Sequence, residues 1–122
     1  MMLSDHAKQT GVALEKAYQF VLWLVPTVEK FPRAQKFLLG DRIQSAAIDV
    51  LEGLVEATYT RNRVPVLRVV NLKLEKLRLL FRLAADLKIL DMRRYEHAAR
   101  SIDEIGRLVG GWLKASHAPE AA

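Results

Sequence analysis

The sequence predicts an all-α protein, folded as an antiparallel up-down-up-down four-helix bundle in one domain covering residues 1–122. Apolar residues recur every three or four positions along most of the chain, and no window alternates as a β-strand does. The links between the four periodic segments are short, which favours antiparallel neighbours. A chain of this length buries a modest core without disulfides, and it contains no cysteine.

The first two helices are expected at about 11–30 and 33–59, separated by Phe31 and Pro32. A residue that precedes proline disfavours α geometry, so Pro32 ends the first helix and begins the second. The apolar stripe of the first helix is Ala13, Ala17, Phe20 and Leu24; that of the second is Leu39, Ile43, Ala47, Val50, Leu54 and Ala57.

The third helix is expected at about 65–89, with Pro65 suited to a first helical position. The fourth is expected at about 91–114, with Asp91 as its N-cap. The remainder, 115–122, is predicted to be a frayed tail.

Positive charge is concentrated in the second half of the chain. Residues 1–60 carry 6 Lys/Arg and 7 Asp/Glu, whereas residues 61–122 carry 13 and 7, so the halves differ as −1 and +6. Such a basic half favours an anionic partner such as nucleic acid. The N-terminus lacks a basic region of the secretory type, and the most apolar run is too short to span a bilayer. We therefore expect a cytoplasmic protein with no membrane partner.

The third helix carries a regular polar column. Its members, Arg68, Asn71, Glu75, Arg78 and Arg82, follow at spacings of three and four, which predicts one line opposite the apolar seam of this helix. The seam consists of Leu67, Val70, Leu74, Leu77, Phe81 and Ala84. Arginine binds phosphate through a planar fork, so the column suits a nucleic-acid backbone or an acidic protein surface. A solvated face in which Glu75 pairs with Arg78 or Arg82 is the alternative, and both interpretations stay open at this point.

The same helix has more apolar surface than one bundle face needs. Beside its seam runs a second apolar line of Val66, Val69, Leu80, Leu83 and Leu87. A homo-oligomer interface would cover this line, and we predict Leu80, Leu83, Leu87 and Trp112 as interface residues. The alternative is that the third helix lies centrally within its own bundle.

The fourth helix has basic residues every seven positions: Arg93, Arg100, Arg107 and Lys114. Glu96, Asp103 and Glu104 lie between them at ion-pair spacing, which favours a self-neutralising outer face. Gly106, Gly110 and Gly111 indicate either a close approach by another helix or a weak last turn.

Residue patterns of catalysis are missing, so we predict that the protein is not an enzyme and needs no metal or cofactor. A di-metal bundle requires Glu-x-x-His pairs, which do not occur. His97 follows Arg93 and Arg94 by one turn, and their charge opposes a bound cation. No serine has the turn and base of a nucleophile, and there is no glycine-rich phosphate loop.

Four stretches carry a resemblance to a known family. The segments "YQFVLWLVPTVEKFPR" and "LLGDRIQSAAIDVLEGLVEA" resemble the four-helix-bundle proteins encoded in intervening sequences of bacterial 23S ribosomal RNA genes. The segments "LKLEKLRLLFRLAADLKIL" and "YEHAARSIDEIGRLVGGWLK" are more similar to the Avd branch, the accessory variability determinants of diversity-generating retroelements. Together the similarity covers about residues 18–114.

The resemblance implies a non-catalytic, barrel-shaped homopentamer that binds RNA or DNA and the reverse transcriptase of the retroelement. It also assigns Arg78 and Arg82 to a functional positive surface, which Arg68 and Lys88 would extend. Arg33 and Lys36, near Lys30, form either a secondary binding rim at one end of the bundle or a solvated corner. The alternative function is a structural or protein-interaction bundle of the ribosomal intervening-sequence type.

Overall fold

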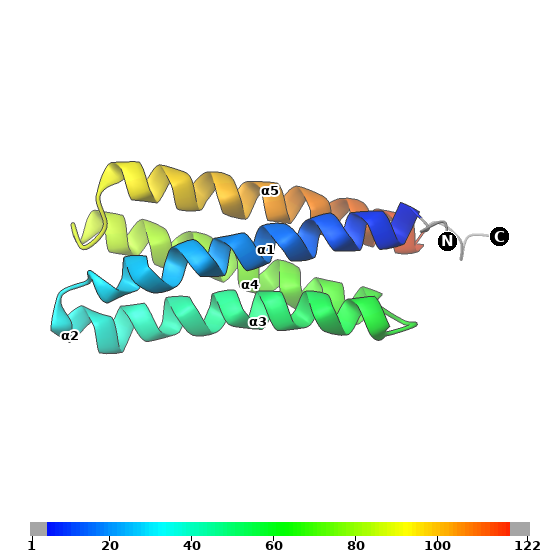
Figure 1. Cartoon of the computed structure of the whole chain (residues 1–122), viewed down its shortest axis with the longest axis horizontal. Helices are drawn as coiled ribbons and strands as arrows, with labels where there is room; N and C mark the ends of the chain where they lie inside the picture. The colour runs from blue at the N-terminus through cyan, green and yellow to red at the C-terminus, as the bar shows by residue number, and fades with distance from the viewer. Residues whose placement is uncertain (1–4, 118–122) are drawn as a thin grey trace.

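The computed structural model describes residues 5–117, which form four long antiparallel helices (Figure 1). No residue of this described part lies in a β-strand, as the periodicity predicted. The elements are α1 (Asp5–Glu29), α2 (Arg33–Gln35), η1 (Lys36–Gly40), α3 (Asp41–Tyr59), α4 (Val64–Asp86) and α5 (Met92–His117).

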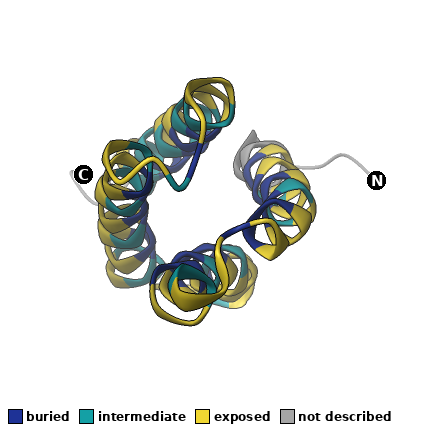
Figure 2. Cartoon of the chain, turned by 90° about the vertical axis from the view of Figure 1, so that its left-hand side faces the viewer, coloured by how far each residue is buried: buried dark blue, intermediate teal, exposed yellow. Residues whose placement is uncertain are grey.

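The long helices form a ring in which α1 and α4 are diagonal. Both α1 and α4 pack against α3 and α5, and Figure 2 shows the buried residues lining the inside of this ring. The α1–α2 connection and the α4–α5 turn lie together at one end of the bundle, which we call the corner end (Figure 1). The α3–α4 loop lies at the opposite end, the loop end, with the start of α1 and the finish of α5.

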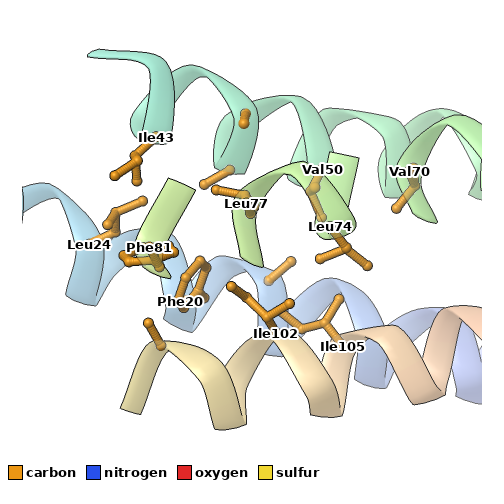
Figure 3. Packing of buried hydrophobic residues seen from close by; sticks show 14 of the residues in the cluster. Phe20, Leu24, Ile43, Val50, Val70, Leu74, Leu77, Phe81, Ile102 and Ile105 are labelled. Carbon is orange, nitrogen blue, oxygen red and sulfur yellow. The ribbon is translucent and has the colours of Figure 1, made fainter. Parts of the chain in front are cut away.

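The core is built from the apolar stripes of all four helices. Phe20, Leu24, Leu74, Leu77 and Phe81 converge on the axis of the bundle, as Figure 3 shows, and each is at most 4% exposed. Full burial of such a side chain stabilises the fold by roughly 1.5–3 kcal/mol. This core therefore holds the outer flanks of the helices in fixed positions.

The second helical segment, formed by α2, η1 and α3, is continuous over residues 33–59, as predicted, but it contains a π-helical turn at η1. The backbone N–H of Asp41 donates to the carbonyl of Lys36, five residues earlier. The turn lies close to α1, because a Cβ on Gly40 would be 2.7 Å from Val28 Cγ1. On α3, a Cβ on Gly53 would lie 2.5 Å from Val70 Cγ2 of α4. Both glycines therefore permit close helix contacts.

Several helix ends differ from the prediction. α1 begins at Asp5, before residue 11, and α5 continues to His117, so the predicted fraying of residues 115–117 is wrong. Residues 118–122 of the predicted tail lie outside the described part.

The third helix ends at Asp86, three residues before the predicted end, because the chain turns there in a Schellman motif. Lys88 adopts a left-handed conformation with φ 60°. Its N–H donates to Ala85 O at 3.0 Å, and that of Ile89 donates to Ala84 O at 2.9 Å.

Candidate nucleic-acid interface

The polar column of α4 follows one flank of the helix, but this flank faces α5. The guanidinium of Arg78 forms an ion pair with Asp103 of α5, and its Nη2 lies 4.0 Å from where a Cβ on Gly106 would be. The residues opposite the core are instead Leu72, Leu79 and Leu83, all exposed. The prediction that the column lies opposite the seam is therefore wrong, because the column is rotated toward the neighbouring helix.

Arg78 is largely neutralised within the bundle. It pairs with Asp103 and also with Glu75, whose Oε1 is 3.3 Å from Nη2. The hydrogen bond to Asp103 is the main cause that raises the pKa of Arg78 above its usual range. The guanidinium thus remains charged, but two carboxylates already share that charge.

The other members of the column are more open. Arg82 Nε is 3.8 Å from Asp86 Oδ2, and both of these side chains are about 70% exposed, so this pair is weak. Arg68 is exposed and has no ion pair among the described side chains. The column therefore offers Arg68 and Arg82 to a ligand more readily than Arg78.

Two carboxylates of α5 pair with neighbouring helices and not with arginines of α5. Asp103 binds Arg78 of α4, and Glu104 Oε1 lies 3.1 Å from Lys16 Nζ of α1. Glu96, one turn from Arg93 and Arg100, forms no ion pair among the described side chains. The prediction of a self-neutralising outer face on this helix is therefore wrong. Within residues 11–116, whose side chains are described, no ion pair includes the following exposed residues, which we call the α5 ridge: Arg93, Arg100, Arg107 and Lys114.

The α5 ridge has the geometry of a track for phosphates. Seven residues make nearly two helical turns, so successive ridge cations are about 10.5 Å apart along the axis of α5. All four side chains project from one outer line of the bundle. A row of exposed cations that are not already neutralised is the arrangement that attracts a polyanion. Sequence spacing showed this row, but it did not show which helix its carboxylates contact.

The remaining predicted basic residues gather at the corner end. Arg33 is the exposed first residue of α2, and Lys88 is exposed in the α4–α5 turn at the same end (Figure 1). Lys36 is half-buried and its Nζ lies 2.6 Å from Glu29 Oε2, so its charge is compensated. Lys88 therefore lies at the same end as the predicted basic residues, whereas Lys36 is not a free cation.

Exposed apolar side chains form a stripe on the outside of α4, the α4 apolar face: Val69, Leu72, Leu79, Leu83 and Leu87. Leu83 and Leu87 belong to the predicted interface set, whereas Leu80 is half-buried beside α3. Trp112 is wrong as an interface residue, because it is 0% exposed within the core, with Arg63 5.4 Å from its ring centroid. Leu72 and Leu79 were missed, although their seven-residue spacing places them on one line.

A second apolar surface lies between α1 and α3 and comprises Tyr18, Leu22, Val25, Ile48 and Val55, the α1/α3 apolar face. Lys16 of α1 pairs with α5, so the opposite flank, which carries Tyr18 and Val25, is turned toward α3. Similarly, Asp49 of α3 pairs with Lys73 of α4, which turns Ile48 and Val55 away from α4. Two separate apolar faces therefore remain on different sides of the bundle.

The model of the bAvd-like family matches residues 11–116, which is most of the chain. The chain belongs to the bAvd-like family. Among solved structures, this bAvd-like chain is similar to a protein of unknown function from the S23 ribosomal protein family of Bacteroides thetaiotaomicron. The TM-score is 0.80 at 17% identity, over 87% of this chain and 98% of that one, so the likeness shows a shared fold. No curated protein matches the sequence.

Two further observations concern the described part of the bAvd-like chain. None of its helices is both long enough and apolar enough to cross a bilayer. Its histidine, aspartate and glutamate side chains nowhere gather in threes around a possible metal position.

Proposed function

We propose that this bAvd-like chain is a non-enzymatic accessory protein of a diversity-generating retroelement. In the cytoplasm it would bind the reverse transcriptase of the element together with template RNA or complementary DNA during mutagenic reverse transcription. Family membership supports the accessory role. The α5 ridge is the single observation that supports nucleic-acid binding, because its cations have no carboxylate partners among the described side chains.

The chemistry of this surface favours binding by charge and shape. Its cations are arginine and lysine side chains on a helix exterior, which contact phosphates without reading bases. Arg68 and Arg82 of α4 extend the basic surface across the α4–α5 side, while Arg33 and Lys88 extend it at the corner end. We expect affinity for many sequences and a strong dependence on salt concentration.

We also propose a homo-oligomer in which the α4 apolar face of one copy meets the α1/α3 apolar face of the next. Two different faces make a head-to-tail contact, and repeats of such a contact form a closed ring when the rotation between copies divides a full turn. Charge supports this pairing, because Lys76 lies one turn from Leu72 and Leu79, whereas Glu15 and Glu52 each lie one turn from members of the other face. The family resemblance points to five copies.

A structural or protein-interaction bundle is the second candidate function. It is favoured by the shared fold with a member of the S23 ribosomal protein family. This candidate requires no nucleic-acid binding. A reverse-transcriptase gene beside this gene would favour the first function, whereas a position inside a 23S ribosomal RNA gene would favour the second.

The test is a titration of labelled single-stranded RNA at two salt concentrations, followed by anisotropy. For the wild type, log affinity should fall by about 0.7 per neutralised phosphate for each unit of log salt. The triple variant Arg93→Ala, Arg100→Ala, Arg107→Ala should lower that slope by about 2.

The matched control changes two exposed cations elsewhere, through Arg42→Glu and Arg61→Ala, with the same change in net charge. It should retain more affinity than the ridge variant. Equal losses in both variants would reject the ridge as the binding surface, and affinity independent of salt would reject the electrostatic mechanism. Light scattering on the same sample should give a mass of five subunits.

A further inference from the structure

The groove between α1 and α5 contains two adjoining hollows beside the α5 ridge. One has a volume of about 490 Å³ and is lined by Trp23, Asp91, Arg93, Arg94 and His97. The other, of about 330 Å³, lies further along the groove and also includes Trp23 and His97 in its wall. The two aromatic rings thus form the shared boundary of the two hollows, and each hollow falls within the size range of small-molecule sites, roughly 300–1,000 Å³. We call the first hollow, which includes Arg93, the pocket.

The aromatic wall of this pocket is held in place by the core. The ring centroids of Trp23 and His97 are 4.6 Å apart, with a tilt of 47°. On the inner side, Trp23 stacks on Phe20 at 5.8 Å, and Phe20 makes an edge contact with Phe81 at 5.9 Å. Phe20 and Phe81 are buried, whereas Trp23 is half-buried and His97 is exposed. A fixed aromatic surface therefore reaches solvent at this groove.

The polar wall of the pocket leaves one arginine available. Asp91 accepts a hydrogen bond from the backbone N–H of Arg94 at 2.8 Å and also pairs with the Arg94 guanidinium. Asp91 and Arg94 are therefore occupied with each other. Arg93 has no ion pair among the described side chains, and it is also the first member of the α5 ridge.

An aromatic wall beside an unpaired arginine is the arrangement that proteins use to bind an unpaired nucleotide. Proteins that hold single strands combine a cationic track for the backbone with aromatic rings on which bases stack. An acidic peptide would use the arginines but would not need the rings. A duplex would not supply a base, because its bases are already stacked on one another.

We infer that the pocket at Trp23 and His97 takes one unpaired base of a single-stranded RNA, while Arg93 contacts the adjoining phosphate. The strand would continue along the α5 ridge toward Arg100. This inference rests on the proposed nucleic-acid binding and assigns a stacking site within it. Sequence spacing could not indicate this site, because Trp23 and His97 belong to different helices and are distant in the chain.

The experiment follows RNA binding by two independent signals, anisotropy of a labelled oligonucleotide and tryptophan fluorescence of the protein. Stacking on Trp23 should quench its emission, and Trp23→Phe should remove the change, because Trp112 is buried in the core. His97→Ala, at an exposed position, should weaken binding by about tenfold. Tyr59→Ala is the matched control, since Tyr59 is an exposed aromatic residue at the loop end of α3, and it should bind as the wild type does.

An oligonucleotide with abasic sugars separates stacking from phosphate contact. It should bind the wild type and His97→Ala with equal affinity, because neither complex then contains a stacked base. Anisotropy showing tight binding without tryptophan quenching, or with no loss in His97→Ala, would overturn the stacking site and leave the proposed function standing. Absence of RNA binding by either signal would overturn both. Equal quenching by duplex RNA would also overturn the inference.

Discussion

The outer surfaces of α4 and α5 differ, although both helices carry arginines at regular spacing. On α4 the line opposite the core is apolar, and its most buried arginine, Arg78, is paired on the flank that faces α5. On α5 the outer line is basic, because Asp103 and Glu104 pair with neighbouring helices. The spacing of residues within a helix therefore determines on which flank a charged side chain lies. The residues of the neighbouring helix determine whether that charge is neutralised.

The largest expected effect tests the apolar side of this comparison. Leu72→Glu with Leu79→Glu should dissociate the assembly, because each buried leucine contributes roughly 1.5–3 kcal/mol and each glutamate would be desolvated at the contact. Both side chains are more than half exposed in the single chain, so helicity should persist. Light scattering and circular dichroism measure the two outcomes.

The control places the same residue type on the other helix. Arg100→Glu with Arg107→Glu should keep the oligomer and lose RNA binding. If the α4 variant keeps its mass, α4 is not the contact surface. If Leu22→Glu on the α1/α3 apolar face leaves the mass unchanged, the head-to-tail pairing is wrong.

The second-largest effect concerns an arginine of α4 that would lose its carboxylate partner, as the arginines of the α5 ridge have none. Asp103→Ala removes the main carboxylate partner of Arg78 and should release its guanidinium for phosphate. RNA affinity should rise several-fold, and the salt slope should increase by about 0.7. Because the pair is exposed by more than a third on both sides, the free energy of unfolding should fall by no more than about 1 kcal/mol.

Anisotropy titrations and urea unfolding provide these two measurements. Glu75→Ala is the matched control, since it removes the weaker partner and leaves the Asp103 pair in place. Glu75→Ala should change the salt slope of RNA binding less than Asp103→Ala does. An unchanged slope in Asp103→Ala would mean that Arg78 does not reach the RNA.

A smaller effect concerns the glycines of α5, which were expected to mark either a close approach or a weak last turn. Neither holds for Gly110 or Gly111 within this chain, since α5 continues past them and an added Cβ on either would meet no atom of another helix within 4 Å. Gly110→Ala and Gly111→Ala should each raise the free energy of unfolding by about 1 kcal/mol.

Gly53→Ala on α3 supplies the contrast, because its Cβ would lie 2.5 Å from Val70 Cγ2, and it should destabilise the fold. Urea denaturation compares the three variants. A loss of stability or of assembly in an α5 variant would mean that a second copy packs against that glycine.

The smallest effect is at the start of α5. Asp91 accepts a hydrogen bond from the backbone N–H of Arg94, and this bond lowers the pKa of the Asp91 carboxyl. By contrast, α4 begins without a side-chain cap. A lowered carboxyl pKa contributes stability above the ordinary value near 4, and this contribution is lost as the pH falls through the lowered pKa. Asp91→Ala should therefore lower Tm at pH 7, with a difference that narrows below about pH 4.

Thermal melts at several pH values provide the measurement. Asp91→Asn retains an acceptor for the cap without a titrating carboxyl, so its Tm should depend less on pH in this range. A Tm difference between Asp91→Ala and the wild type that stays constant down to pH 2 would rule out this contribution of the charge.

Much of the fold was predictable because apolar spacing reports directly on burial. The predicted stripes containing Phe20 and Leu54 both face the core. The π-helical turn at η1 was not predictable, since it depends on the contact of Gly40 with Val28 of another helix. The early finish of α4 depends on Lys88, a residue type that rarely indicates a left-handed turn.

The candidate site was predictable only in part. Periodicity located the rows of Arg78 and Arg93, but the partner of each charge depends on the registration of adjacent helices. The α5 carboxylates illustrate this, since the same spacing fits a pair within the helix and a pair across the bundle. The approach of His97 to Trp23 likewise joins two residues that are distant in the chain.

The ring order of the helices also bears on how the chain folds. Each pair of consecutive long helices lies side by side, but the ring closes only when α5 meets α1, the first and last helices of the chain. Closing a long loop costs more entropy than closing a short hairpin, and such distant contacts slow folding. Joining the two ends through a linker and opening the chain at residues 60–63 would make that contact local and the α3–α4 contact distant.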